Sequence, residues 1–225
     1  TVPHQHLFGL TFRLFWPLLT QRAFYTQVCN FTEDIFRLAQ SLTCYTLIST
    51  PSHLKRLNDQ LDWPSIAGRC YMVVSSAAPL AREDSLFAAQ VLGTSIREIY
   101  GSSETGALAW RTQEQNNEHW SLLPEISLSQ EGNLTNASGP YIEPQYEALS
   151  DRIETSSTGT FRLLGRLDRI IKVEGKRLSL TKMESAIERT EWIDAAKVQI
   201  LTRKRDEVVV VAELSKAGQT VRNEL

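Results

Sequence analysis

A strand, helix, strand order in the first half of the chain constrains the fold more than any other feature of the sequence. Residues 70–74 read Cys-Tyr-Met-Val-Val, an apolar and β-branched run typical of a strand buried in a parallel sheet. A helical pattern follows from Arg82 to about Leu92, and a second strand is expected over 96–100. This order predicts an α/β layer with loops at its strand ends, the usual place for a ligand.

The elements around this layer divide the chain into two parts. Asn30 and Glu33 have capping-box spacing ahead of a helix, and residues 45–48 suggest a short strand. Short alternating segments over 119–164 predict a small antiparallel sheet. Further on, Thr181 and Glu184 have capping-box spacing ahead of a helix to about Trp192, and two strands follow over 196–202 and 208–214.

We therefore expect a domain boundary near 165–169. Residues 1–165 would belong to a large domain, with an α/β layer over 1–118 and a small β region over 119–165. Residues 166–225 would form a small, incomplete α+β domain.

Composition excludes several classes of protein. The 225 residues are 42% hydrophobic and 22% charged, which is typical of a globular chain and argues against disorder, collagen and coiled coil. A net charge of -2 gives no general attraction to nucleic acid or an anionic membrane. The apolar stretch over 7–19 is interrupted by Arg13 and Pro17 and is too short for a membrane span. Three cysteines without CxxC spacing favour neither a disulfide framework nor a zinc site, so a cytoplasmic location is expected.

The most informative stretch is 98–106, Glu-Ile-Tyr-Gly-Ser-Ser-Glu-Thr-Gly. Glycines let backbone amides approach a phosphate, serine hydroxyls donate to phosphate oxygens, and Glu104 is a hard oxygen ligand for magnesium. An ordinary strand-end turn explains the same residue types equally well.

Two further stretches are weaker signals. Residues 165–177 hold five basic and two acidic residues, which by composition fit a solvated hairpin, although Arg166 and Asp168 lie at the expected boundary between domains. His4 and His6 lack a third metal ligand at a familiar spacing, so one of them in a pocket wall is the better interpretation.

Taken in order, these stretches resemble the adenylate-forming superfamily of acyl-CoA and aryl-CoA synthetases, luciferases and peptide-synthetase adenylation domains. Residues 100–106 are similar to its aromatic-Gly-x-Thr-Glu motif, and 76–80, Ser-Ala-Ala-Pro-Leu, to its adenine-side loop. Residues 165–168 with Lys172 and Gly175 resemble its hinge motif, and 3–9 resemble the segment whose histidine lines the acyl pocket.

The resemblance implies a role for individual residues at the nucleotide. Ala78 and Pro79 would flank the adenine, and Tyr100, followed by Gly101 and Ser102, would stack on it. Ser103 takes the place of the family's threonine near the phosphates, with Glu104 at Mg2+. Asp151 would hold the ribose hydroxyls, with Arg166 beside it, although Leu149-Ser150 precedes it instead of Thr-Gly.

The resemblance also implies roles away from the nucleotide. His6 and Phe8 would line the acyl pocket, and Asp168 would be the hinge. Lys172, Gly175 and Arg177 would lie on the thiol-tunnel side, where Gly175 leaves room for a pantetheine arm.

The implied activity is ATP-dependent conversion of a carboxylic acid to an acyl-adenylate, followed by acyl transfer to coenzyme A or to a phosphopantetheine carrier protein. The Ser/Thr/Gly-rich phosphate loop ending in lysine and the family's C-terminal lysine are absent from the 225 residues. Both stabilise charge on the transferring phosphoryl group, so we expect this chain alone to bind nucleotide weakly and not to turn over. The alternative is a non-catalytic module that binds an acyl group or a carrier protein. The sequence leaves the acid and the thiol acceptor open.

Overall fold

The computed structural model describes residues 1–113, 118–132, 134–143, 145–156, 159–167, 170–173, 176–202 and 206–224. These residues group into two compact units. The first contains Thr1–Ser129, Asn136–Glu147 and Thr155–Arg162, and the second contains Gln130–Thr135, Ala148–Glu154 and Leu163–Leu225.

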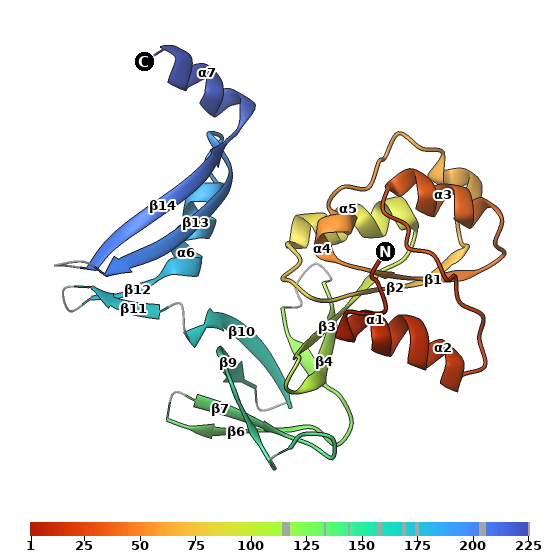
Figure 1. The fold of residues 1–225 in the computed structure, drawn as a ribbon, viewed down its shortest axis with the longest axis horizontal. Helices are drawn as coiled ribbons and strands as arrows, with labels where there is room; N and C mark the ends of the chain where they lie inside the picture. The colour runs from red at the N-terminus through yellow and green to blue at the C-terminus, as the bar shows by residue number, and fades with distance from the viewer. Residues whose placement is uncertain are drawn as a thin grey trace. The chain divides into compact units, whose positions relative to one another are not determined.

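A mixed sheet with the order β1-β2-β3-β4-β5-β10-β9 forms the framework (Figure 1). Neighbouring strands are parallel from β1 to β3 and antiparallel from β3 to β5 and between β5 and β10. The strands are β1 Tyr45–Ser49, β2 Cys70–Ser75, β3 Ile96–Ser102, β4 Gly106–Thr112, β5 Trp120–Leu122, β9 Asp151–Thr155 and β10 Thr160–Arg166. The expected α/β layer is confirmed.

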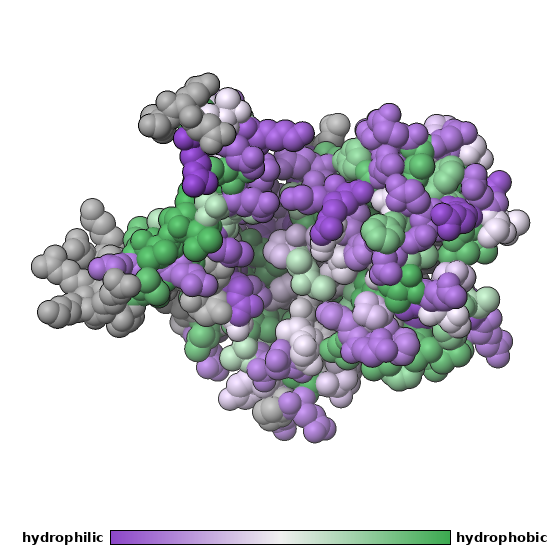
Figure 2. Space-filling model, turned by 45° about the horizontal axis from the view of Figure 1, so that its top comes forward, coloured by the Kyte–Doolittle hydropathy of each residue, from purple (hydrophilic) through white to green (hydrophobic). Residues whose placement is uncertain are grey.

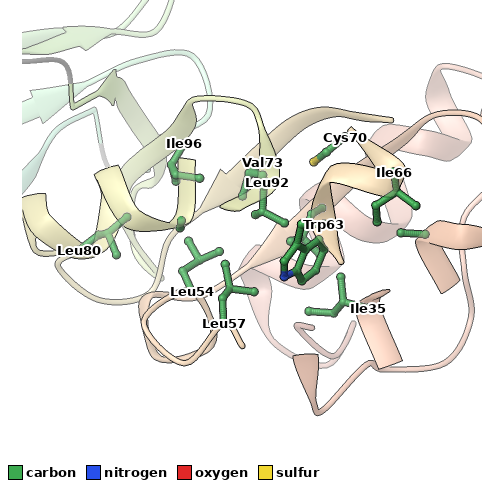
Figure 3. Close-up of a cluster of buried hydrophobic side chains, with 13 residues drawn as sticks. Ile35, Leu54, Leu57, Trp63, Ile66, Cys70, Val73, Leu80, Leu92 and Ile96 are labelled. Atoms are coloured by element: carbon green, nitrogen blue, oxygen red, sulfur yellow. The ribbon is translucent and has the colours of Figure 1, made fainter. Parts of the chain in front are cut away.

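Helices cover both faces of the parallel strands (Figure 1). On one face lie α3 Thr32–Gln40, α4 Pro51–Leu54, a 3-10 turn over Trp63–Ile66, and α5 Arg82–Leu92. Their apolar side chains surround Trp63 together with Val73 of β2, as Figure 3 shows. On the other face lie α1 Leu7–Gly9, a π-helical segment over Leu10–Phe15, and α2 Trp16–Leu19. There Phe8 packs with Ile48 and Val74, so both faces of the strands are buried, as apolar parallel strands require.

The region expected to be one small antiparallel sheet divides between two sheets. Strands β6 Ser127–Glu131, β7 Leu134–Ser138 and β8 Glu147–Leu149 form a three-stranded sheet. Strands β5, β9 and β10 belong to the large sheet instead. Strand β5 pairs with β4, Phe161 of β10 pairs with Trp120 of β5, and β9 lies next to β10.

The second unit contains an α+β arrangement. Strands β11 Ile170–Val173 and β12 Lys176–Ser179 form a hairpin, followed by α6 Leu180–Glu188. Strands β13 Ile193–Thr202 and β14 Asp206–Leu214 form a second antiparallel hairpin, and α7 spans Lys216–Glu224. The helix and hairpin expected from the sequence are confirmed.

Both predicted capping boxes are wrong in detail. Phe31, not Asn30, precedes α3, and its amide donates to the carboxylate of Asp34 (3.3 Å), while Glu33 instead accepts from Asn58 (3.1 Å). Ser179, not Thr181, caps α6 by accepting from the amide of Lys182 (3.3 Å). Glu184 points into the interior of the unit, where it accepts from a strand amide instead.

Polar side chains dominate the face seen in Figure 2, with separate apolar patches between them. Exposed apolar side chains occur in both units, for example Leu19 in the first and Val211 in the second. Within the described ranges, no helix has the length and apolar character needed to cross a bilayer. All three cysteines are unpaired.

Candidate functional site

Two loops predicted to carry the site lie at the same edge of the first unit's sheet. Strands β2 and β3 are parallel, with Ser75 paired to Glu98, so the loop at 76–80 and the turn at 103–105 both follow carboxyl ends of strands. The hydroxyl of Ser76 donates to the carbonyl oxygen of Ile99 (2.9 Å) and ties the first loop to β3. The structure thus brings Ala78 and Pro79 to the edge that also carries Tyr100.

The loop at 76–80 is exposed at its centre and anchored at its ends. Ala77, Ala78 and Pro79 are exposed, whereas Leu80 packs into the core. Ala77 has a φ of +80°, a left-handed conformation that costs a non-glycine residue about 1 kcal/mol or more. Such a conformation persists only where the surroundings fix it.

The turn between β3 and β4 satisfies much of its own hydrogen bonding. The Ser102 hydroxyl accepts from the amides of Glu104 (3.3 Å) and Thr105 (3.2 Å), and the amide of Ser102 donates to the Thr105 hydroxyl (3.1 Å). These three amides therefore hold the turn together. Ser103 and Glu104 are the exposed side chains at its tip.

The glycines of the turn have a structural reason that sequence reasoning missed. A Cβ on Gly101 would overlap the carbonyl oxygen of Gly106, and Gly106 itself has a φ of +64°. Close approach of β4 requires glycine at 101, and the left-handed backbone favours glycine at 106, whether or not a phosphate binds nearby.

Glu104 is an exposed carboxylate suited to a cation. Hydrogen bonds with Ser102 and with its own backbone lower the pKa of Glu104, so it is ionised at neutral pH. The described part of the chain contains no cluster of three or more acidic, histidine or cysteine side chains that could hold a metal by itself. One carboxylate fits Mg2+, which usually takes one or two protein ligands together with phosphates and water.

Tyr100 lies in an aromatic cluster on the sheet. Its ring centroid is 5.6 Å from that of Trp120 and 5.8 Å from that of Phe161, and the last two rings stack at 6.5 Å. Trp120 and Phe161 are buried, whereas Tyr100 is half-buried, so the cluster fixes a ring that is still partly accessible.

The remaining predicted residues of the first unit lie in the amino-terminal segment. His6 is exposed, and its Nδ1 accepts from the amide of Phe8 (3.2 Å), which caps the start of α1. Phe8 is buried in the cluster on the second face of the sheet. His6 therefore lies at the surface, while Phe8 contributes to the core.

In the second unit, Asp151 begins β9 and Arg166 ends β10. The amide of Leu167 donates to the carbonyl of Ser150 (2.6 Å), so the neighbours of these two residues meet. Lys172 lies in β11 and pairs with Arg177 in β12. Asp168 and Gly175 lie outside the described residues.

A polar network under the two loops was not foreseen. Glu98 is 3% exposed and accepts from Arg111 Nε (3.0 Å) and Nη2 (3.1 Å). Gln113 Nε2 donates to Glu98 Oε1 (2.7 Å) and to the carbonyl oxygen of Leu80 (2.8 Å). Hairpin pairing of Glu98 with Arg111 across β3 and β4 was the signal that could have revealed this network.

The fold gives the class of protein that this chain resembles. The chain has the fold of the adenylate-forming ligases, so the resemblance to them is confirmed at the level of the fold. No family model matches the chain.

Particular relatives agree with this class. A 4-coumarate–CoA ligase from Cereibacter sphaeroides is 29% identical over 140 residues, covering 62% of this chain and 32% of that protein. ATP-bound MatB from Rhodopseudomonas palustris has a TM-score of 0.79 at 17% identity, over 100% of this chain and 53% of that one. Wild-type MenE from E. coli, with a bound analogue of OSB-AMS, has a TM-score of 0.68 at 18% identity and the same coverage. The chain thus spans 32% of the curated relative and 53% of each solved structure.

Proposed function

We propose that this chain takes part in the activation of a carboxylic acid with ATP. The acid becomes an acyl-adenylate with release of pyrophosphate, and the acyl group then passes to the thiol of coenzyme A or of a carrier protein. The observation that carries the proposal is that loop 76–80 and turn 103–105 both follow the carboxyl ends of neighbouring parallel strands, with Ser76 hydrogen-bonded to β3. This arrangement occurs in a fold shared with an ATP-bound protein, MatB.

The exposed residues at this edge suit a nucleotide. Ala78 and Pro79 offer a small apolar surface, and the partly accessible ring of Tyr100 offers an aromatic one, so together they would enclose an adenine. Ser103, at the exposed tip of the turn, would lie near the phosphates. In the second unit, Asp151 would hold the ribose hydroxyls, with Arg166 close by.

Mg2+ would neutralise phosphate charge when bound, and Glu104 would be one of its ligands because its carboxylate is exposed and ionised. Other parts of the proposal concern the acid and the thiol. His6 and Phe8 would border the acyl pocket, and residues from Arg166 onward would form a mobile domain with its hinge at Asp168. Lys172, Gly175 and Arg177 would lie beside the path of the thiol.

Nucleotide binding by the purified chain tests the proposal. AMP should raise the thermal midpoint in a concentration-dependent way, because a ligand that binds only the folded state stabilises it. Replacing Tyr100 by leucine should remove most of this shift, since stacking on a base contributes about 1–3 kcal/mol. Replacing Glu104 by glutamine should weaken Mg-ATP while leaving metal-free AMP unchanged.

The controls separate the proposal from its alternatives. Phe31→Leu changes an exposed aromatic residue before α3, far along the chain from either loop, and should leave the AMP shift intact. We expect no pyrophosphate release from ATP and an acid, and stoichiometric release would contradict that part of the proposal. If AMP produced no shift at any concentration, nucleotide binding would be refuted, and a non-catalytic module that binds an acyl group or carrier protein would be favoured.

A further inference from the structure

The buried carboxylate of Glu98 connects the loop at 76–80 with the aromatic cluster around Tyr100. A carboxylate removed from water is costly unless hydrogen bonds and an opposite charge compensate it. Arg111 supplies a bidentate pair at 3.0 and 3.1 Å, and Gln113 supplies a third donor at 2.7 Å. Glu98 is thereby held in one orientation on β3, next to the strand end that loop 76–80 follows.

The first connection runs to the loop at 76–80. The same Nε2 of Gln113 that binds Glu98 also donates to the carbonyl of Leu80 (2.8 Å), at the end of the loop. Ser76, at its beginning, donates to the carbonyl of Ile99, the residue after Glu98 (2.9 Å). The loop is thus hydrogen-bonded at both ends, to β3 at Ser76 and to the side chain of Gln113 at Leu80. Ala77, with its left-handed backbone, lies between these two anchors.

The second connection runs to the aromatic ring. The guanidinium carbon of Arg111 lies 4.4 Å from the ring centroid of Trp120, and Trp120 packs against Tyr100. A guanidinium held by a carboxylate on one side and placed over an indole ring on the other restricts both. One network therefore restrains loop 76–80 and, through Trp120, the ring of Tyr100.

From this geometry we propose that Glu98, Arg111 and Gln113 are positioning residues that set the spacing between loop 76–80 and the Tyr100 ring for an adenine base. The inference rests on the proposed nucleotide binding. Among the described residues, the contacts of the network reach the loop and the aromatic cluster but not the exposed tip of the 103–105 turn, so we expect its effect on the base and not on the phosphates.

Gln113→Leu tests the inference because it removes the hydrogen bond to the carbonyl of Leu80 and replaces the amide by an apolar side chain of similar size. The affinities of the purified chain for AMP and for ribose 5-phosphate should be measured by ligand-observed NMR. We expect AMP affinity to fall about threefold to tenfold, the value of one net hydrogen bond, with ribose 5-phosphate unchanged.

Gln130→Leu is the matched control, since Gln130 Nε2 likewise donates to a carbonyl, that of Ile153 (3.0 Å), in the second unit. It should cause a similar loss of stability and no change in the AMP to ribose 5-phosphate ratio. An unchanged ratio in Gln113→Leu, with the parent chain preferring AMP, would overturn the positioning role and leave the proposed function standing. A parent chain that binds no AMP would overturn both.

Discussion

At the scale of the residue, Gly101 shows how a motif glycine can be required by packing. A side chain there would run into the backbone of Gly106 on the facing strand, so the hairpin that carries the candidate site depends on its absence. The likeness of residues 100–106 to a nucleotide-binding motif offers a second explanation for this glycine. If packing requires it, a side chain at 101 lowers stability, whereas if nucleotide binding requires it, a side chain there lowers affinity.

We predict that Gly101→Ala destabilises the first unit by about 1–3 kcal/mol, the usual cost of overpacking, as measured by urea unfolding. Gly93→Ala is the control: Gly93 has a φ of +69° but open space around its Cα, so only the conformational cost of about 1 kcal/mol applies. Equal losses in the two variants would show that β4 moves aside easily and that packing does not explain Gly101.

At the scale of the element, α6 is fixed to β13 through two glutamates one helical turn apart. Glu184 accepts from the amide of Val198 (2.8 Å) and Glu188 from that of Ala196 (2.9 Å). These amides lie two residues apart, so they point to the same edge of β13, the edge opposite β14. The helix therefore accepts hydrogen bonds from two amides of β13 and is tied to the strand by them.

We expect Glu184→Ala to cost about 1–3 kcal/mol, because it removes a buried hydrogen bond from the amide of Val198 to a carboxylate. Hydrogen exchange at Val198 should become faster, while Glu188→Ala, which removes an exposed side chain, should have a smaller effect. Unchanged exchange at Val198 in the Glu184 variant would mean that the carboxylate contributes little to holding the helix on the strand.

Sequence patterns predicted elements better than they predicted polar contacts. The β-branched run at 70–74 and the helical pattern from Arg82 specify local structure, and both were confirmed. The predicted capping boxes were wrong because spacing alone does not decide which of several carboxylates binds a given amide. The carboxylate of Asp34 accepts from the amide of Phe31, whereas that of Glu33 accepts from the side chain of Asn58. The Glu98 network depends on strand register across β3 and β4, which the sequence indicates only after the hairpin is known.

At the scale of the whole molecule, the two units differ in the size of their cores. Among the residues whose burial the structure describes, the first unit buries large aromatic side chains such as Trp63, Trp120 and Phe161, whereas the second buries aliphatic ones such as Leu180 and Val198. Stability follows the apolar area removed from water, so the second unit should open more readily.

Tryptophan fluorescence can separate the two units, since Trp192 is in the second and the other four tryptophans are in the first. We predict that urea unfolding followed by fluorescence shows a minor transition below the main one, and that Trp192→Phe removes the minor transition from fluorescence. The same variant should retain both steps in circular dichroism, because the helix and hairpin still unfold. Trp192 is 43% exposed, so its replacement removes little packing and works as a reporter change. A single transition that coincides for both signals, in the parent chain and in Trp192→Phe, would instead show that the chain unfolds as one cooperative body.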